Sequence, residues 1–162
     1  MIRIVEPSDE KPDRAEVVPD LVDRVFRRDG WLQRELGLEH RPEQERMALQ
    51  VAQSLATDNP FLVEAGTGVG KSLAYLIPGI LFSMESKRPL IVSTHTISLQ
   101  EQIQQKDLDR CRDLFGRIPE LERYAEFKTA LLVGRGNYLC QNRLARAMQG
   151  QAELFDSAEI GR

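Results

Sequence analysis

The sequence predicts an α/β protein in which a parallel sheet is covered by helices on both faces. Short apolar runs alternate with stretches of helical spacing, which is typical of a parallel sheet. The length of 162 residues allows one domain with a core of ordinary size. The composition, 41% hydrophobic and 29% charged, excludes a disordered or fibrous chain. The predicted strands are residues 61–63, 89–92 and 130–133.

The first predicted elements are helices. Residues 1–18 are polar, carry prolines and lack apolar periodicity, so we expect a mobile leader there. Apolar residues then recur at helical spacing up to Phe26, and Gly30 ends this short helix. A longer helix begins at Pro42 and ends at Asp58. Its expected inward face consists of Met47, Ala48, Val51, Ala52 and Leu55.

Each predicted strand leads into a further helix. The first strand is followed by a glycine-rich stretch and a helix from Leu73, in which Pro78-Gly79 predicts a kink or an early end. The second strand leads into a helix that starts near Leu99, has a drifting apolar pattern and ends at Gly116. Helical spacing resumes at Leu139 after the third strand. The order is therefore strand, helix, strand, helix, strand, helix.

Charge, hydropathy and cysteine content exclude several classes of protein. The longest uncharged apolar stretch, residues 73–84, is shorter than the roughly 20 residues that cross a membrane. No secretion signal begins the chain, so we expect a cytoplasmic protein without membrane contact. Two cysteines are too few for a disulfide framework, and Cys111 has the spacing of a buried core thiol. His40 and His95 share no metal-binding spacing with the cysteines.

Residues 64–72 have the pattern of a phosphate-binding loop. They read Glu-Ala-Gly-Thr-Gly-Val-Gly-Lys-Ser and lie between a predicted strand and a predicted helix. Backbone N–H groups at the amino end of a helix hold polyphosphate, and glycines allow its close approach. We expect Lys71 to reach the β- and γ-phosphates and Ser72 to bind Mg²⁺. A chance glycine-rich turn is the alternative, but the flanking elements favour a nucleotide site. That site consists of Ala65, Gly66, Thr67, Gly68, Val69, Gly70, Lys71 and Ser72.

Several motifs resemble those of one helicase family. The pattern Ala-x-x-Gly-x-Gly-Lys-Ser resembles the first ATP motif of superfamily-two helicases. Residues 41–47, Arg-Pro-Glu-Gln-Glu-Arg-Met, resemble the glutamine motif of the DinG and XPD helicases, and Gln44 takes the place of the glutamine that reads adenine. Residues 93–102 are similar to the family's motif Ia, which holds one DNA strand by its phosphates. Thr94 and Gln100 match that motif most directly, and the bacterial DinG type is the closer branch.

A further motif resembles the beginning of the family's iron–sulfur domain. Residues 134–140 read Gly-Arg-Gly-Asn-Tyr-Leu-Cys, and Cys140 takes the place of the first cluster ligand. A 4Fe-4S cluster needs four thiolates, whereas this chain has two cysteines. The resemblance therefore implies a cluster only in a full-length protein.

The resemblance implies the first, incomplete motor lobe of an ATP-dependent DNA helicase, with a RecA-like P-loop fold. Such an enzyme uses ATP and Mg²⁺ to move on single-stranded DNA and unwind duplexes. We expect a polar leader and short helix in 1–37, the ATP-binding part of the lobe in 38–139, and the start of the iron–sulfur insert in 140–162. The sole Asp-Glu step lies at residues 9–10, so the later carboxylate motif is missing. We therefore expect a fragment that hydrolyses little ATP alone.

Two other functions are compatible with the sequence. One is a non-catalytic nucleotide-binding or interaction module, and the other is an unrelated P-loop ATPase or kinase. Residues 127–150 carry four basic side chains and no acidic one, which suits phosphate contacts or a solvated surface equally. The net charge of -3 argues against the overall basic charge that is typical of nucleic-acid-binding proteins. Stimulation of ATP hydrolysis by single-stranded DNA distinguishes the helicase from both alternatives, and the oligomeric state stays open.

Overall fold

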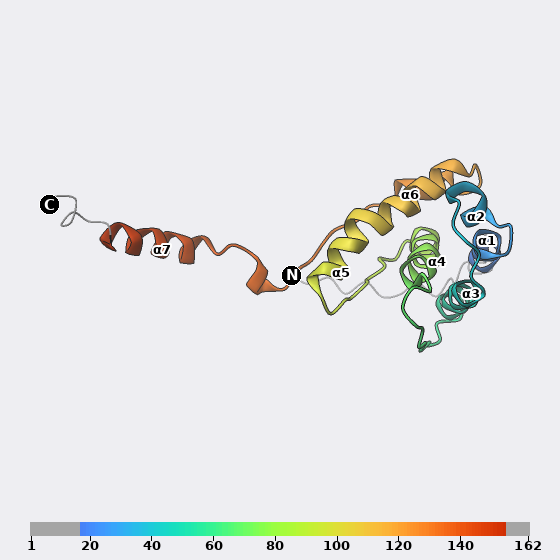
Figure 1. Cartoon of the computed structure of the whole chain (residues 1–162), viewed down its shortest axis with the longest axis horizontal. Coiled ribbons are helices and arrows are strands. Elements are labelled where there is room, and N and C mark those ends of the chain that lie inside the picture. The colour runs from blue at the N-terminus through green and yellow to red at the C-terminus, as the bar shows by residue number, and fades with distance from the viewer. Residues whose placement is uncertain (1–16, 155–162) are drawn as a thin grey trace. The chain divides into compact units, whose positions relative to one another are not determined.

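The computed structural model describes residues 17–154, and every regular element within them is helical (Figure 1). One compact unit ends at Thr129 and a second begins at Ala130. No β-strand occurs in residues 17–154, so the predicted parallel sheet and the RecA-like P-loop fold built on it are wrong for this structure. The predicted leader falls mostly outside the described residues, but its last two residues belong to a helix and Val18 is fully buried.

The three predicted strands lack the neighbours that a strand requires. A strand is stable when its N–H and C=O groups pair with an adjacent chain. No backbone hydrogen bond of the described residues pairs 61–63, 90–92 or 131–133 with another segment. Their central side chains are instead exposed, at 97% for Leu62, 85% for Ile91 and 82% for Leu132. Local preference for a strand is therefore not realised by these residues.

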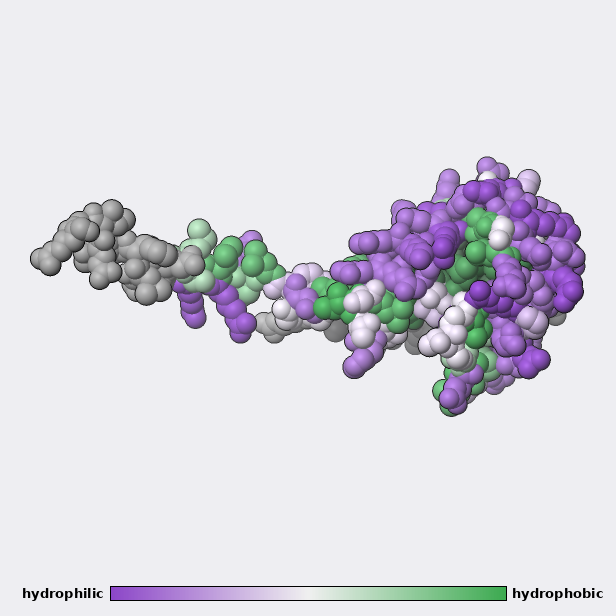
Figure 2. All heavy atoms as spheres, in the orientation of Figure 1, coloured by the Kyte–Doolittle hydropathy of each residue, from purple (hydrophilic) through white to green (hydrophobic). Residues whose placement is uncertain are grey.

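The first unit is a group of helices packed around α4. Residues on most sides of α4 are buried, and it contacts α3, α1 and α6. Figure 2 shows hydrophilic residues over much of the viewed surface of this unit. The elements are α1 (Val17–Phe26), α2 (Trp31–Leu36), α3 (Pro42–Thr57), α4 (Lys71–Ser86), α5 (Ile97–Gln102), the π-helical turn η2 (Ile103–Asp107), α6 (Leu108–Arg117) and the 3₁₀ turn η3 (Glu122–Glu126).

The predicted helices before the glycine-rich stretch are present, and α2 is an addition to them. Pro42 occupies the first turn of α3, and Asp58 ends this helix in the left-handed conformation with φ 55°. On the predicted face, Met47, Ala48 and Ala52 are buried, whereas Val51 and Leu55 are half-buried. The amphipathic spacing therefore identified the packed side of α3 and overstated its width.

A kink or an early end was predicted at Pro78-Gly79, and the early end is wrong, because α4 continues past Pro78 to Ser86. Proline cannot donate the backbone hydrogen bond to the residue four positions earlier, which costs stability in a helix interior. Pro78 is fully buried in the core, however, and packing on both sides offsets that loss. At the neighbouring Gly79 a β-carbon would lie 2.7 Å from Cδ2 of Leu90, so the chain at Leu90 passes directly over this part of α4.

The drifting pattern after Leu99 has a structural explanation. Helical residues run without a break from Ile97 to Arg117, but η2 contains the wider π-type turn in the middle. A π turn adds one residue and shifts the side chains that follow it. Cys111 of α6 is fully buried, which confirms its predicted place in the core. Burial, with the nearby Asp107 charge, raises the pKa of its thiol to about 12, so it stays a neutral thiol.

Gly30 allows the close turn between α1 and α2. A β-carbon there would lie 2.6 Å from the carbonyl oxygen of Arg27 and 2.8 Å from that of Arg24, and backbone atoms cannot yield as a flexible side chain can. We expect Gly30→Ala to lower the free energy of unfolding by about 1–3 kcal/mol, the usual cost of overpacking. Thermal and urea unfolding followed by circular dichroism measure it.

The matched control for Gly30 is Gly116 of α6. A β-carbon at Gly116 meets no atom within 4 Å. Because glycine costs a helix about 0.5–1 kcal/mol relative to alanine, Gly116→Ala should leave stability unchanged or raise it. Equal stability of the two variants would show that the turn at Gly30 relaxes at no cost.

The second unit consists of the 3₁₀ turn η4 (Arg135–Asn137) and α7 (Gln141–Leu154). The helix predicted after Leu139 is therefore confirmed. Leu139, Leu144 and Met148 are exposed, and Figure 2 shows apolar residues on the surface of α7. Val133 N donates a 3.3 Å hydrogen bond to the Tyr138 hydroxyl. Among residues 17–154, no helix combines the length and hydropathy that would cross a membrane.

Candidate nucleotide-binding site

The glycine-rich loop before α4 has the backbone shape of an anion cradle. Gly68 and Gly70 have φ values of 82° and 87°, a region that glycine adopts without steric cost. Gly70 is the amino-terminal cap of α4, and no side chain caps this end of the helix. The first N–H groups of a 16-residue helix therefore have no side-chain acceptor. Together with the helix dipole they favour a negatively charged ligand.

Lys71 spans the same loop with its ammonium group. Nζ donates hydrogen bonds of 2.9 Å to the Ala65 carbonyl and 2.7 Å to the Gly66 carbonyl. An ammonium group has three donors, so one remains for a further acceptor. A β-carbon at Gly66 or Gly68 would meet no atom within 4 Å, which leaves room for a ligand beside the loop. The open loop, the Lys71 ammonium group and the N–H groups at the start of α4 are thus suited to bind the negatively charged oxygens of a polyphosphate.

The first turn of α3 holds the loop from a second side. Gln44, which is only 6% exposed, donates from Nε2 to the Gly70 carbonyl at 2.9 Å. A β-carbon on Gly70 would lie 2.9 Å from Cδ of Gln44, so the loop and the amide are in close contact. The Arg41 guanidinium donates to the Gly68 carbonyl. The structure therefore places Gln44 at the predicted loop although 26 residues separate the two bonded positions.

The contact of Arg41 is a feature that sequence reasoning missed. Arg41 stands three residues before Gln44, at the amino-terminal cap of α3. The only signal was its place as the first residue of the motif at 41–47, in which a role was predicted for Gln44 alone. Its role in holding a loop carbonyl became visible only from the packing of α3 on that loop.

Ser72, the predicted Mg²⁺ ligand, is half-buried in the first turn of α4. Magnesium is normally held by one or two protein oxygens together with phosphate oxygens and water. The described residues contain no group of three or more His, Cys, Asp or Glu side chains that could hold a metal ion. Ser72 fits a shared magnesium shell and does not form a complete one.

The predicted DNA-contacting residues lie in and beside α5. The Thr94 hydroxyl donates to the Thr96 carbonyl at 3.3 Å, and the Thr96 hydroxyl accepts from Leu99 N at 3.3 Å as the cap of α5. Gln100 is half-buried on the same helix. No hydrogen bond in the described residues joins Thr94 or Gln100 to the glycine-rich loop. They form a separate segment that follows the loop helix in sequence.

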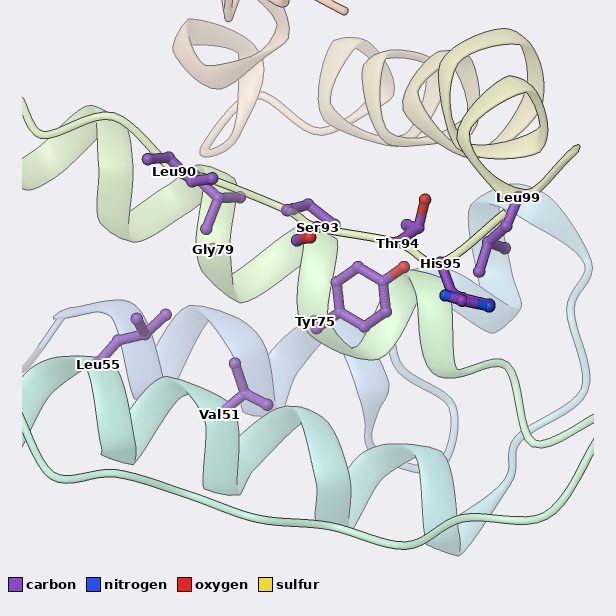
Figure 3. Close-up of a pocket in the computed structure, with 11 residues that line it drawn as sticks. Val51, Leu55, Tyr75, Gly79, Leu90, Ser93, Thr94, His95 and Leu99 are labelled. Atoms are coloured by element: carbon purple, nitrogen blue, oxygen red, sulfur yellow. The ribbon is translucent and has the colours of Figure 1, made fainter. Parts of the chain in front are cut away.

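An open cavity of about 520 Å³ connects α4 to this segment (Figure 3). Its wall is largely apolar, with a polar portion at residues 93–95. The sequence did not predict this cavity, because its lining residues come from three helices and from the segment 90–95. The lining residues are Val51, Leu55, Tyr75, Gly79, Leu90, Ile91, Val92, Ser93, Thr94, His95 and Leu99.

The two cysteines differ in burial and belong to different units. Cys140 is exposed in the second unit, whereas Cys111 is buried in the core of the first. A cluster ligand is a thiolate, and the raised pKa of Cys111 keeps its thiol protonated. A 4Fe-4S cluster needs four thiolates, so the two cysteines of this chain alone do not fit one.

Comparisons with known proteins confirm the resemblance to DinG helicases. An ATP-dependent helicase DinG of Mycobacterium tuberculosis is 39% identical over 134 residues, covering 77% of this chain and 19% of the relative. A 3'-5' exonuclease DinG of Bacillus subtilis is 36% identical over 121 residues, covering 75% and 12%. An ATP-dependent DNA helicase DinG of Salmonella choleraesuis is 43% identical over 107 residues, covering 65% and 14%.

The chain thus spans about a fifth or less of the length of these relatives. No family model matches the sequence. No solved structure matches it either. The relationship therefore concerns the matched residues, which carry the glycine-rich loop and the segments around it.

Proposed function

From this relationship to the DinG helicases over about three quarters of the chain, we propose that these residues are the ATP-binding part of an ATP-dependent DNA helicase. The observation that carries the proposal is the loop geometry. Two glycines in the left-handed conformation leave the start of α4 without a side-chain cap, and Lys71 lies across the loop. The relatives' names point to ATP as the nucleotide.

Each residue of the site has a distinct task in this proposal. The N–H groups at the start of α4 bind phosphate oxygens, and Lys71 turns its ammonium group to the β- and γ-phosphates. Ser72 supplies one oxygen to Mg²⁺, which neutralises phosphate charge when it is bound. These groups bind and orient the nucleotide. Hydrolysis in a whole protein also needs a residue that positions the attacking water and a cation from elsewhere.

DNA contact is assigned to Thr94 and Gln100 in the same proposal. Hydroxyl and amide groups bind phosphate oxygens without reading bases, so we expect single-stranded DNA to be bound without sequence preference. Lys128, Arg143 and Arg146 add positive charge in the later part of the chain. Binding should therefore weaken as the salt concentration rises.

One experiment separates this proposal from a non-catalytic module and from an unrelated ATPase or kinase. ATP turnover by the whole protein that carries this chain is measured with and without single-stranded DNA. A helicase hydrolyses ATP faster when DNA is present, a non-catalytic module hydrolyses none, and an unrelated kinase or ATPase ignores the DNA. An unchanged rate on adding DNA would reject the helicase proposal.

Adenine selection is assigned to Gln44. One N–H of its amide donates to the Gly70 carbonyl, which leaves the second N–H and the carbonyl oxygen for a ring nitrogen and the exocyclic amine of adenine. Gln44→Ala should reduce the preference for ATP over GTP by about tenfold, as expected for the loss of one or two hydrogen bonds. Competition between the two nucleotides at equilibrium measures the effect.

Gln50→Ala is the matched control, because Gln50 is an exposed glutamine on the same helix. It should keep the preference for ATP. A wild-type protein that binds both nucleotides equally, or a Gln44→Ala variant that still prefers ATP, would remove Gln44 from the adenine site.

An iron–sulfur cluster is proposed only for a whole protein in which Cys140 is one of four ligands. The 162-residue polypeptide should be colourless and iron-free after anaerobic purification, because its two cysteines cannot supply the four thiolates of a cluster. The whole protein should contain about four irons per chain. Cys140→Ser should lose them, and Cys111→Ser should keep them. Iron retained by Cys140→Ser would show that residues 134–140 are only a helix start.

A further inference from the structure

Tyr75 lies on the helix that follows the glycine-rich loop, and it lines the cavity beside residues 93–95. It lies on α4 one turn after Ser72 and is half-buried. Burial raises the pKa of its phenol, and the Asp107 carboxylate raises it further against the lowering effect of Ser72. Tyr75 is therefore a neutral hydroxyl that can both donate and accept.

The phenol of Tyr75 is directed into the cavity. Tyr75 lines the cavity together with Ser93, Thr94 and His95. In Figure 3 the hydroxyl of Tyr75 points toward Thr94 and His95, while the ring stands over α4. Tyr75 thus belongs to the helix that starts at the loop, and its side chain faces the residues that lead into α5.

The far end of α5 is fixed by another buried group in this region. Asp107 is only 3% exposed and accepts a 3.2 Å hydrogen bond from Nε2 of Gln102, the last residue of α5. Its charge also acts on Tyr75. The helix that carries Gln100 is therefore held by Thr96 at its start and by Asp107 at its end. Tyr75 lies beside residues 93–95, which precede this helix.

We propose that Tyr75 is a positioning residue that couples the nucleotide loop to the DNA-contacting segment 93–100. The proposal rests on the proposed function, because it needs ATP at the loop and DNA at this segment. A packed helix moves as a body, so a shift at Ser72 on nucleotide binding is carried to the phenol one turn away. The phenol then changes its contact with the wall formed by residues 93–95. Coupling of this kind acts equally in both directions on binding.

The test is Tyr75→Phe in the whole protein, which removes the hydroxyl and keeps the ring. The readout is the ratio of ATP turnover with saturating oligo(dT) to turnover without it. We expect that ratio to fall about three- to tenfold, the size of one hydrogen bond's contribution. The increase in ATP affinity on adding oligo(dT) should shrink by a similar factor.

Tyr124→Phe is the matched control. Tyr124 is fully buried and donates a 2.6 Å hydrogen bond to Glu85, so this variant also loses a phenol hydroxyl from the interior. It should lower the melting temperature without changing the ratio. The proposal is overturned if Tyr75→Phe leaves the ratio unchanged, or lowers both rates by one factor as a purely structural change would. Failure of the proposed function is distinguishable, because the unmodified protein would then show no stimulation.

Discussion

Replacing Lys71 by alanine should abolish DNA-stimulated ATP hydrolysis in the whole protein and weaken ATP binding at least about a hundredfold. The ammonium group bonds to the loop at the carbonyls of Ala65 and Gly66, at the start of the helix where phosphate would bind. Hydrogen bonds to charged groups contribute about 1.5–3 kcal/mol each, and a lysine at two phosphates makes more than one. Fluorescent ATP analogue titration and a phosphate-release assay measure the two losses.

The control for Lys71 lies at the opposite end of the same helix. Lys87 caps the carboxyl end of α4 with φ 55°, which asparagine also tolerates. Lys87→Asn removes one positive charge and should retain both binding and turnover. Circular dichroism shows whether Lys71→Ala keeps the helical fold. Normal turnover by folded Lys71→Ala would reject the nucleotide site.

Gly70→Ala should lower ATP affinity by roughly tenfold or more. An alanine at φ 87° costs about 1–2 kcal/mol, and its β-carbon would lie 2.9 Å from Cδ of Gln44. The loop must therefore change its turn or displace the glutamine, and either movement shifts the N–H groups at the start of α4. Isothermal titration with a non-hydrolysable ATP analogue gives the affinity.

A second substitution separates backbone strain from the steric contact with Gln44. In Gly70→Ala combined with Gln44→Gly the side-chain contact is gone while the unfavourable φ remains. Recovery of phosphate affinity in the double variant, measured with inorganic tripolyphosphate, would assign the loss to the contact. Full affinity in Gly70→Ala alone would show that this backbone conformation is not used in binding.

The helices were predictable because their signal is contained in a few neighbouring residues. Pro42 and Asp58 mark the two ends of α3, and the spacing of Met47, Ala48 and Ala52 marks its packed side. Strands cannot be predicted from neighbouring residues alone, since a strand needs an adjacent strand that is often far away in the sequence. Leu62 and Ile91 have strand-forming neighbours and still remain exposed and unpaired.

The candidate site was predictable where a motif named the residue. Residues 64–72 and Gln44 lie together as the resemblance implied, although their roles toward ATP stay predictions. Tyr75 was not recognisable, because a tyrosine in an apolar helix has the same spacing as a core residue. Its place at the cavity depends on how residues 93–95 cross α4, which no local pattern encodes.

The π turn at Ile103–Asp107 determines which residues of α5 face the same side as the packed residues of α6. Successive residues of an α-helix are about 100° apart around the axis, and the π turn takes up one additional residue locally. If the same residues formed a plain α-helix, α5 would be rotated by about that angle against α6. Leu108, Cys111 and Phe115 keep α6 locked in the core. A homologous chain one residue shorter here would have a plain α-helix, and its counterpart of Gln100 would still face the same side of the molecule.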